Sequence, residues 1–151
     1  MNVNEISSDF QFVGSRVCEL SVKNDFVFFP ENSSLSKNID VSYEIVDIST
    51  DDTSVLGILN LYVTCKISEV ETDKVDTNNC NIYLALNGCF ISGTKTDSNI
   101  FKQMLSVNGC AALYSIARSF IMSLSAQISI NCNIVLPMIN TFRLVEKSEE
   151  N

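Results

Sequence analysis

Alternating apolar and polar residues mark several segments of the chain, and a period of two is the pattern of half-buried β-strands. The clearest segment covers residues 55–67, and less regular alternation covers residues 10–23 and 39–48. Gly14 interrupts the first of these strands and is a candidate β-bulge. Residues 80–91 are apolar on both faces, so we expect them to form a central strand.

A helical period follows the strands. Beyond Gly109, apolar residues recur on a stripe that can lie against one face of a sheet: Leu113, Ile116, Ala117, Phe120, Ile121, Leu124 and Ile128. Ser98 is a candidate N-cap for a shorter helix that ends at Leu105. After Pro137, residues 140–147 can form a last helix.

The order of these elements predicts the α+β class, with a four-stranded antiparallel sheet packed on one face by a long helix and a short C-terminal helix. At 151 residues the chain is most simply one domain, long enough to bury a core. We expect this domain to span residues 1–151, with flexible ends at 1–9 and 148–151.

Residues 103–142 contain a single charged side chain, Arg118, although 19% of the chain is charged. A helix this poor in charge is either the centre of the core or a surface that meets another subunit. The side opposite the apolar stripe carries mainly small residues: Ser115, Ser119 and Ser123, beside Met122. Small residues spaced by four let another subunit approach closely, so we predict self-association here. Arg118 could hold an anion in a catalytic site or form an ion pair at that interface, and we favour the interface.

Phe26, Phe28 and Phe29 form an apolar run outside the strand alternation, and Pro30 ends strand pairing there. A polar loop, residues 31–38, follows this run. Two interpretations remain open. The three rings belong to the core, or they line an apolar groove beside the loop.

Charge and the absence of histidine exclude several functions. The formal net charge of −8 argues against nucleic-acid binding, because phosphate contacts need clustered Lys and Arg. It is compatible with basic partners, or with solubility alone. Without histidine there is no Ser-His-Asp or Cys-His pair, and no imidazole ligand for zinc. Acidic pairs occur only in expected loops, so we expect neither an enzyme, a metal site nor a cofactor.

The six cysteines show no C-x-x-C spacing, and we expect free, buried thiols rather than disulfides. The first residues lack the basic and apolar regions of a secretory signal. No stretch reaches the roughly 18 uncharged apolar residues of a membrane span without dilution by Ser, Asn and Gln. We therefore expect a cytoplasmic protein without direct membrane insertion.

The element order and several C-terminal residues resemble the SecB family of protein-export chaperones. An aromatic residue, an Ala-Arg pair and an apolar-Pro-x-Asn linker carry the resemblance: Leu113-Tyr114, Ile116-Ala117-Arg118, Ile121, Ser123-Leu124, Leu136-Pro137 and Asn140. Residues 88–93, GCFISG, resemble the end of the family's fourth strand. The resemblance implies a four-stranded antiparallel sheet backed by two helices, assembled as a homotetramer that is a dimer of dimers.

Members of that family bind unfolded polypeptides or preproteins in long apolar grooves without ATP. Export-type members deliver them to the translocase motor SecA, and others protect an antitoxin in toxin–antitoxin systems. By position, the resemblance implies a peptide-binding groove lined by Phe26, Phe28, Phe29, Leu136, Met138 and Phe142. It places the oligomer interface at or near Ser115, Ala117, Arg118, Ser119, Met122 and Ser123.

The chain departs from the family at two points. Its last helix is short, and Cys110-Ala-Ala stands where the export family has a proline before its first helix. We therefore predict a divergent SecB-like member rather than the standard export chaperone. We expect an ATP-independent, homo-oligomeric holdase for unfolded polypeptides or preproteins, with Sec-dependent protein export as one role open to it. The alternative is a dedicated chaperone or binding module for one partner, such as an antitoxin.

Overall fold

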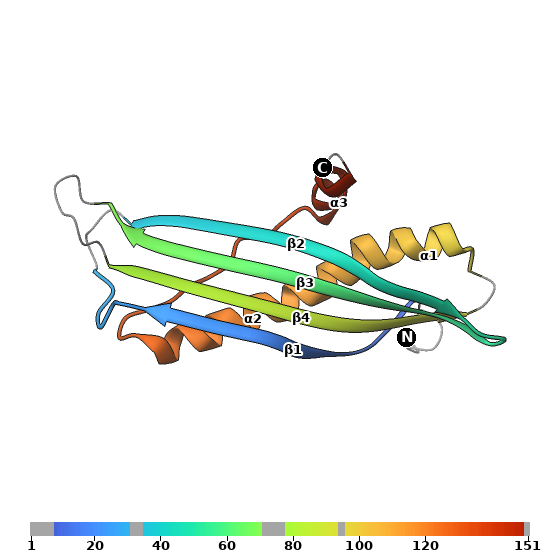
Figure 1. Cartoon of the computed structure of the whole chain (residues 1–151), viewed down its shortest axis with the longest axis horizontal. Coiled ribbons are helices and arrows are strands. Elements are labelled where there is room, and N and C mark those ends of the chain that lie inside the picture. Colours follow the sequence, from blue (N-terminus) through green and yellow to red (C-terminus); the bar gives the residue numbers. More distant parts are fainter. Residues whose placement is uncertain (1–7, 31–34, 71–77, 94–95, 150–151) are drawn as a thin grey trace, which may run out of the picture.

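A computed structural model of the chain describes residues 8–30, 35–70, 78–93 and 96–149. Its sheet has four strands in the order β1-β4-β3-β2, and every neighbouring pair is antiparallel. The strands are β1 (Gln11–Asn24), β2 (Leu35–Thr50), β3 (Ser54–Glu69) and β4 (Asn79–Gly93). Helices cover one face of this sheet, which confirms the predicted α+β class (Figure 1).

The strand order confirms that the strand with two apolar faces is central, since β4 lies between β1 and β3. A register shift between Phe12 and Gly14 in the β1–β4 pair confirms a bulge beside Gly14. The second strand is longer than expected, because β2 begins at Leu35 inside the segment that we expected to be a polar loop. β1 and β2 are the two edge strands of the sheet, and β4 and β3 lie between them. The connection from β1 to β2 therefore leads from one edge of the sheet to the other.

The helical layer is one continuous helix followed by a separate short one. The first part, α1 (Ser98–Met104), continues through a π-helical turn, η2 (Leu105–Gly109), into α2 (Cys110–Ile128). The expected break before Gly109 is therefore wrong. So is the expected cap, because the Asp97 carboxylate accepts hydrogen bonds from the backbone N–H groups of Asn99 and Ile100. The last helix is α3 (Thr141–Glu149). It ends two residues beyond the predicted range, residues 140–147.

Glycines on the sheet let the helix lie close to it. A Cβ at Gly57 would lie 2.7 Å from Leu105 Cδ2 and 2.7 Å from Phe101 Cε1. A Cβ at Gly88 would lie 2.7 Å from Leu113 Cδ2. These positions interrupt the apolar alternation of β3 and β4 because a helix side chain fills the space that a strand side chain would take.

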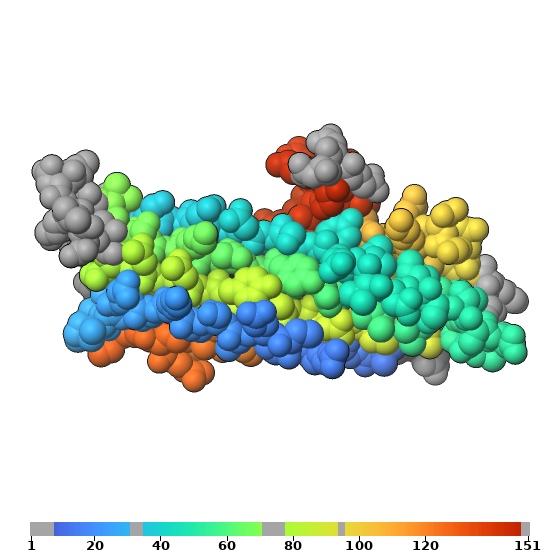
Figure 2. Space-filling model, in the orientation of Figure 1, coloured from blue at the N-terminus to red at the C-terminus, as the bar shows by residue number. Residues whose placement is uncertain are grey.

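The core lies between the inner face of β3 and β4 and the helical layer. β3 buries every second residue from Val55 to Ile67, as its alternation predicts. The opposite face of the sheet is open to solvent, and Figure 2 shows strands across that surface. Among the described residues, no buried side-chain nitrogen or oxygen lacks a hydrogen-bond partner.

The buried face of α2 is rotated from the predicted stripe. Its fully buried residues are Cys110, Leu113, Tyr114, Ala117, Ile121 and Ser125. Ile116 and Phe120, which we expected on the sheet, are only half-buried. The rotation follows from a second covering element, because the segment after α2 packs over the side that carries Tyr114 and Ser125.

The continuous helix Ser98–Ile128 is 31 residues long and contains an 18-residue window with a mean hydropathy of 1.2, so by length and composition it could cross a membrane. We had expected no such segment, because Ser, Asn and Gln interrupt its apolar runs. A core helix passes the same test. Phe101, Leu105 and Leu113 of this helix are fully buried in the core, and 39% of the apolar window is buried.

Candidate functional site

An extended segment, residues 129–140, leads from the end of α2 to α3, and we call it the linker (Figure 1). Its side chains alternate, with Cys132, Ile134 and Leu136 buried, whereas Asn133 and Val135 are exposed. This is the burial pattern of a half-buried strand. However, the linker belongs to no sheet beyond a single bridge at Ile130.

Three side chains of α2 hold the linker backbone. The Ser125 hydroxyl donates to the carbonyl of Met122 at 2.8 Å and accepts from the N–H of Ile134 at 3.0 Å. Arg118 Nε donates to the carbonyl of Leu136 at 2.9 Å, and Tyr114 Oη donates to the carbonyl of Pro137 at 2.8 Å. Burial raises the pKa of Tyr114, so its hydroxyl remains a donor at neutral pH.

Arg118, for which we favoured an ion pair at an interface, has hydrogen-bond partners within its own chain. Besides its bond to the linker carbonyl, its Nη1 lies 2.9 Å from Met138 Sδ. The guanidinium therefore faces the linker in the described chain, where its hydrogen bonds go to a carbonyl and a thioether rather than to a carboxylate. A structural role in fixing the linker was missed by sequence reasoning, because no periodic signal connects α2 with an aperiodic segment.

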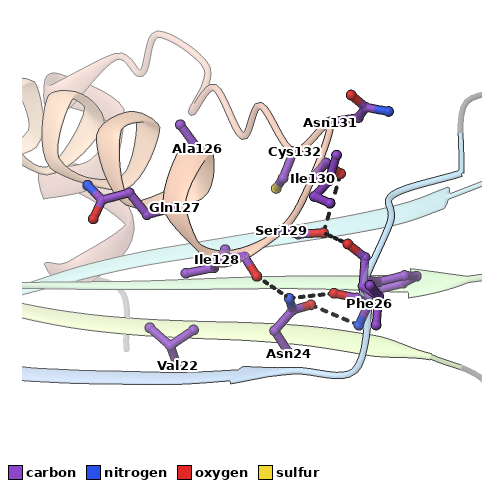
Figure 3. Close-up of a pocket in the computed structure, with 11 residues that line it drawn as sticks. Val22, Asn24, Phe26, Ala126, Gln127, Ile128, Ser129, Ile130, Asn131 and Cys132 are labelled. Carbon is purple, nitrogen blue, oxygen red and sulfur yellow. Dashed lines mark hydrogen bonds between the residues drawn. The ribbon is translucent and has the colours of Figure 1, made fainter.

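The start of the linker is tied to the segment after β1. Phe28 and Ile130 form an isolated parallel bridge, with hydrogen bonds from Phe29 N–H to the Ile130 carbonyl and from Ile130 N–H to the Val27 carbonyl, both 3.3 Å. The Asn24 amide nitrogen donates to the carbonyls of Phe26 and Ile128, each at 2.9 Å (Figure 3). A cavity of about 1040 Å³ opens here, lined by Val22, Asn24, Phe26, Val27 and residues 126–132.

The residues predicted to line a groove divide into two sets. Phe26, Phe29 and Leu136 are buried in the core, and the rings of Phe26 and Phe29 lie 4.5 Å apart between centroids. Phe28, Met138 and Phe142 are exposed by 61%, 80% and 65%. Of the two open interpretations of the phenylalanine run, core packing describes Phe26 and Phe29, whereas Phe28 faces solvent.

Large apolar side chains that are more than half exposed lie on the linker, on the segment after β1 that it bridges, and at the start of α3. We call this set the apolar track: Val27, Phe28, Ile130, Val135, Met138 and Phe142. Val27, Ile130 and Val135 were not predicted, since a single valine or isoleucine among polar neighbours carries no signal of exposure. An extended chain rises about 3.3 Å per residue, so the linker part of the track is roughly 30 Å long.

A second apolar surface lies on the outer side of α2. Ser115, Ile116, Ser119, Phe120 and Ser123 line an open groove of about 550 Å³, and Met122 is 46% exposed. The Ser115 hydroxyl donates to the Ala111 carbonyl at 2.9 Å. Because this hydroxyl is satisfied within the helix, that part of the surface is less polar than its sequence suggests.

The buried thiols offer little chemistry at neutral pH. All six cysteines are free, as predicted, although Cys18 is exposed. Burial raises the pKa of Cys80 to about 11 and that of Cys110 to about 12. It also raises the pKa values of Cys65 and Cys132. Within the described residues, no group of three or more acidic or cysteine side chains could hold a metal ion.

No protein-family model and no curated protein sequence matches the chain. A solved structure of the Mycobacterium tuberculosis Rv1957 SecB-like chaperone, in complex with a ChAD peptide from the Rv1956 HigA1 antitoxin, matches with a TM-score of 0.55 and 11% identity, over 86% of this chain and 90% of that chain. A protein of unknown function from Streptococcus agalactiae matches with a TM-score of 0.43 and 9% identity, over 85% of this chain and 97% of that chain. The first similarity and the observed elements together show that the fold is SecB-like.

Proposed function

We propose that this protein is an ATP-independent holdase that binds unfolded polypeptide segments along the apolar track. The observation that carries the proposal is the exposure of large apolar side chains along the linker and on the two segments next to it, the one after β1 and the start of α3. Soluble proteins rarely keep such surfaces uncovered unless they bind something. Hydrophobic burial is non-directional, so a track of this kind accepts many sequences and needs no catalytic group.

Two properties of the track suit clients of varied sequence. Met138 is its most exposed side chain, and a flexible thioether adapts to differently shaped partners. The net charge of −8 keeps a protein with exposed apolar surface soluble, and it attracts basic segments such as those of many preproteins. The expected cytoplasmic location is part of this proposal.

The holdase is a homo-oligomer in this proposal, built as a dimer of dimers. The proposed interface is the outer side of α2, with Ser115, Ser119, Met122 and Ser123, together with the neighbouring Arg118, whose guanidinium also binds the linker. Its apolar groove and its small side chains support this assignment. Edge strand β1 adds exposed apolar residues beside an unpaired sheet edge: Phe12, Val13, Val17 and Leu20. Such edges are normally covered in native proteins, which also favours association.

Two client classes fit the proposal. Exposed carboxylates on β2, at Asp40, Glu44 and Asp47, would suit delivery of preproteins to SecA during export. The second candidate is a dedicated chaperone for one partner such as an antitoxin, and it is favoured by the SecB-like neighbour that was solved with an antitoxin peptide. Several unrelated clients would support the first class, and a single client the second.

The proposal is tested by suppression of aggregation of several unrelated, chemically unfolded proteins in the absence of ATP. A Phe28→Ser/Met138→Ser double variant should weaken client binding by about tenfold or more, because fully burying one such side chain contributes about 1.5–3 kcal/mol. Ile100→Ser, at a side chain of α1 that is 53% exposed and outside the track, is the matched control. Wild-type protein that suppresses no aggregation would refute the holdase function.

A further inference from the structure

A small cavity lies between the first and last helices, and it shares no residue with the apolar track or with the groove on the outer side of α2. Its volume is about 290 Å³, and its lining consists of Asn99, Lys102, Gln103, Ser106, Val107 and Val145. All of these except Val145 belong to α1 and η2. The four polar residues are spaced by three and four, so they lie along one face of the helix. Val145 of α3 adds an apolar side chain to this polar wall.

Ser106 is the residue of this lining that the fold leaves without a partner. It is only 5% exposed, yet its hydroxyl forms no hydrogen bond within the described residues. A helical serine often donates to the carbonyl four residues earlier, as Ser115 does to Ala111. No fully buried side-chain oxygen of the described chain lacks a partner, so the Ser106 hydroxyl must still be accessible, and the cavity that it lines gives that access. An almost buried hydroxyl without a protein partner indicates a ligand.

The helix geometry at Ser106 is also unusual. Residues Leu105–Gly109 form the π-helical turn η2 within the otherwise α-helical run from Ser98 to Ile128. Single π-helical turns inside α-helices are rare and often occur at functional sites. The last helix, α3, packs against this turn. The cavity therefore forms where the irregular turn meets α3.

The charge of the lining favours an anion. Lys102 is its only charged residue, and it forms no ion pair within the described part of the chain. Its ammonium group only donates, and two amides and the Ser106 hydroxyl can donate beside it. Two acidic residues are close in sequence, but neither lines the cavity. The Asp97 carboxylate accepts from two backbone N–H groups of α1, and Glu146 is exposed.

We propose that this cavity binds a small oxyanion, a carboxylate or a phosphate group, with Lys102 as the counter-ion and Ser106 as the buried donor. The volume is close to the lower end of the range of small-molecule pockets, about 300–1,000 Å³, so one anionic group on a short body fits. Hydrogen bonds from an ammonium to an oxyanion are roughly twice as strong as neutral ones. A free small molecule and the C-terminal carboxylate of a polypeptide share this chemistry.

The test uses sodium phosphate and sodium acetate as probes, at constant ionic strength, with ¹H–¹⁵N TROSY spectra of the wild-type protein. Saturable shifts should be largest at residues 102–107. Lys102→Gln should weaken binding by about 10- to 100-fold, the value of a hydrogen bond to a charged group. Lys66→Gln removes the same charge at an exposed position of β3 outside the cavity, and should leave the affinity unchanged.

Ser106→Ala separates ligand binding from stability. The hydroxyl has no described partner, so its removal should leave the thermal unfolding midpoint unchanged or raise it. The same change should weaken anion binding by about 2- to 10-fold, the value of one neutral hydrogen bond. A lower midpoint with unchanged anion affinity would assign the hydroxyl to the fold and overturn its proposed role.

A short Gly-Ser peptide with a free C-terminus, and the same peptide with a C-terminal amide, distinguish the two sources of the anion. Tighter binding of the free acid, lost in Lys102→Gln, assigns the site to polypeptide ends. Equal binding of the two peptides, or none, assigns it to free small anions, and each of these results supports the site if phosphate or acetate binds.

The absence of saturable shifts with both phosphate and acetate overturns the inference. Equal affinities of the wild type and Lys102→Gln overturn it as well. Both results leave the holdase function standing, because the cavity contains no residue of the apolar track.

Discussion

β3 and the linker bury their side chains in the same alternating way, yet their edges are different. β3 is hydrogen-bonded along both edges, to β2 and to β4, and its inner side chains are covered by the helical layer. The linker is fixed along one edge by three side chains of α2, and its other edge has no described strand partner. The same alternation of buried and exposed side chains thus belongs to a core strand in β3, where both edges are paired. In the linker, it belongs to a segment with one edge free for a partner.

The largest expected difference between the two segments is in core stability. Leu59→Ala in β3 removes a fully buried side chain and should lower the free energy of unfolding by about 2–5 kcal/mol. Val135→Ala in the linker removes a side chain that is 52% exposed, and should cost no more than about 0.5 kcal/mol. Urea unfolding measures both values. Equal costs would contradict the distinction between a core strand and an exposed binding segment.

Attachment of the linker to α2 should be the next largest effect. Ser125→Ala leaves the buried Ile134 N–H without its acceptor, and should cost about 1–3 kcal/mol. Ser42→Ala, at an exposed position of β2 outside the proposed interface, is the control and should stay within about 0.5 kcal/mol. Hydrogen exchange should then speed up at Ile134 but not in β3. Faster exchange in β3 to the same extent would show that the linker and the sheet unfold together.

Alkaline pH should weaken the core through its thiols. Burial raises the pKa of Cys110 from 9.0 to about 12, so the unfolded chain loses this proton at a lower pH than the folded protein does. Stability is therefore unaffected below pH 9 and falls as the pH rises from about 9 toward 12, with a limiting slope of about 1.4 kcal/mol per pH unit. Urea midpoints across this range measure the slope. Cys110→Ala should reduce it without abolishing it, because burial also raises the pKa of Cys80, to about 11. An unchanged slope would contradict this origin.

The smallest expected effect is a difference in how fast cysteines react, which compares the local opening of β3 with that of the linker. Burial raises the pKa values of Cys65 in β3 and of Cys132 in the linker, so both are protonated at neutral pH. Local opening should expose Cys132 at a lower free-energy cost than Cys65, because the linker has a free edge whereas β3 is paired along both edges. With iodoacetamide and mass spectrometry, the exposed Cys18 should react first, Cys132 next and Cys65 last. Reaction of Cys65 before Cys132 would reverse the proposed order of opening.

The sheet could be predicted from the sequence because alternation reports directly on which side chains are buried. β3 and β4 match their predicted segments closely for this reason. The buried face of α2 could not be predicted as well, because Tyr114 and Ser125 are buried by a linker that has no periodic signal of its own. The three phenylalanines show the same limit, since Phe26 and Phe29 are core whereas Phe28, two residues from Phe26, is exposed.

The central claim is that unfolded polypeptides bind along the apolar track, and site-specific photocrosslinking tests it most directly. A benzophenone side chain at Phe142 lies on the track, and the same group at Ser42 lies on the open face of the sheet, on an exposed position opposite Tyr62. With an unfolded client and no ATP, we expect crosslinks from position 142 and none above background from position 42. Equal crosslinking at both positions, or crosslinking only from the open face, would contradict the proposed site.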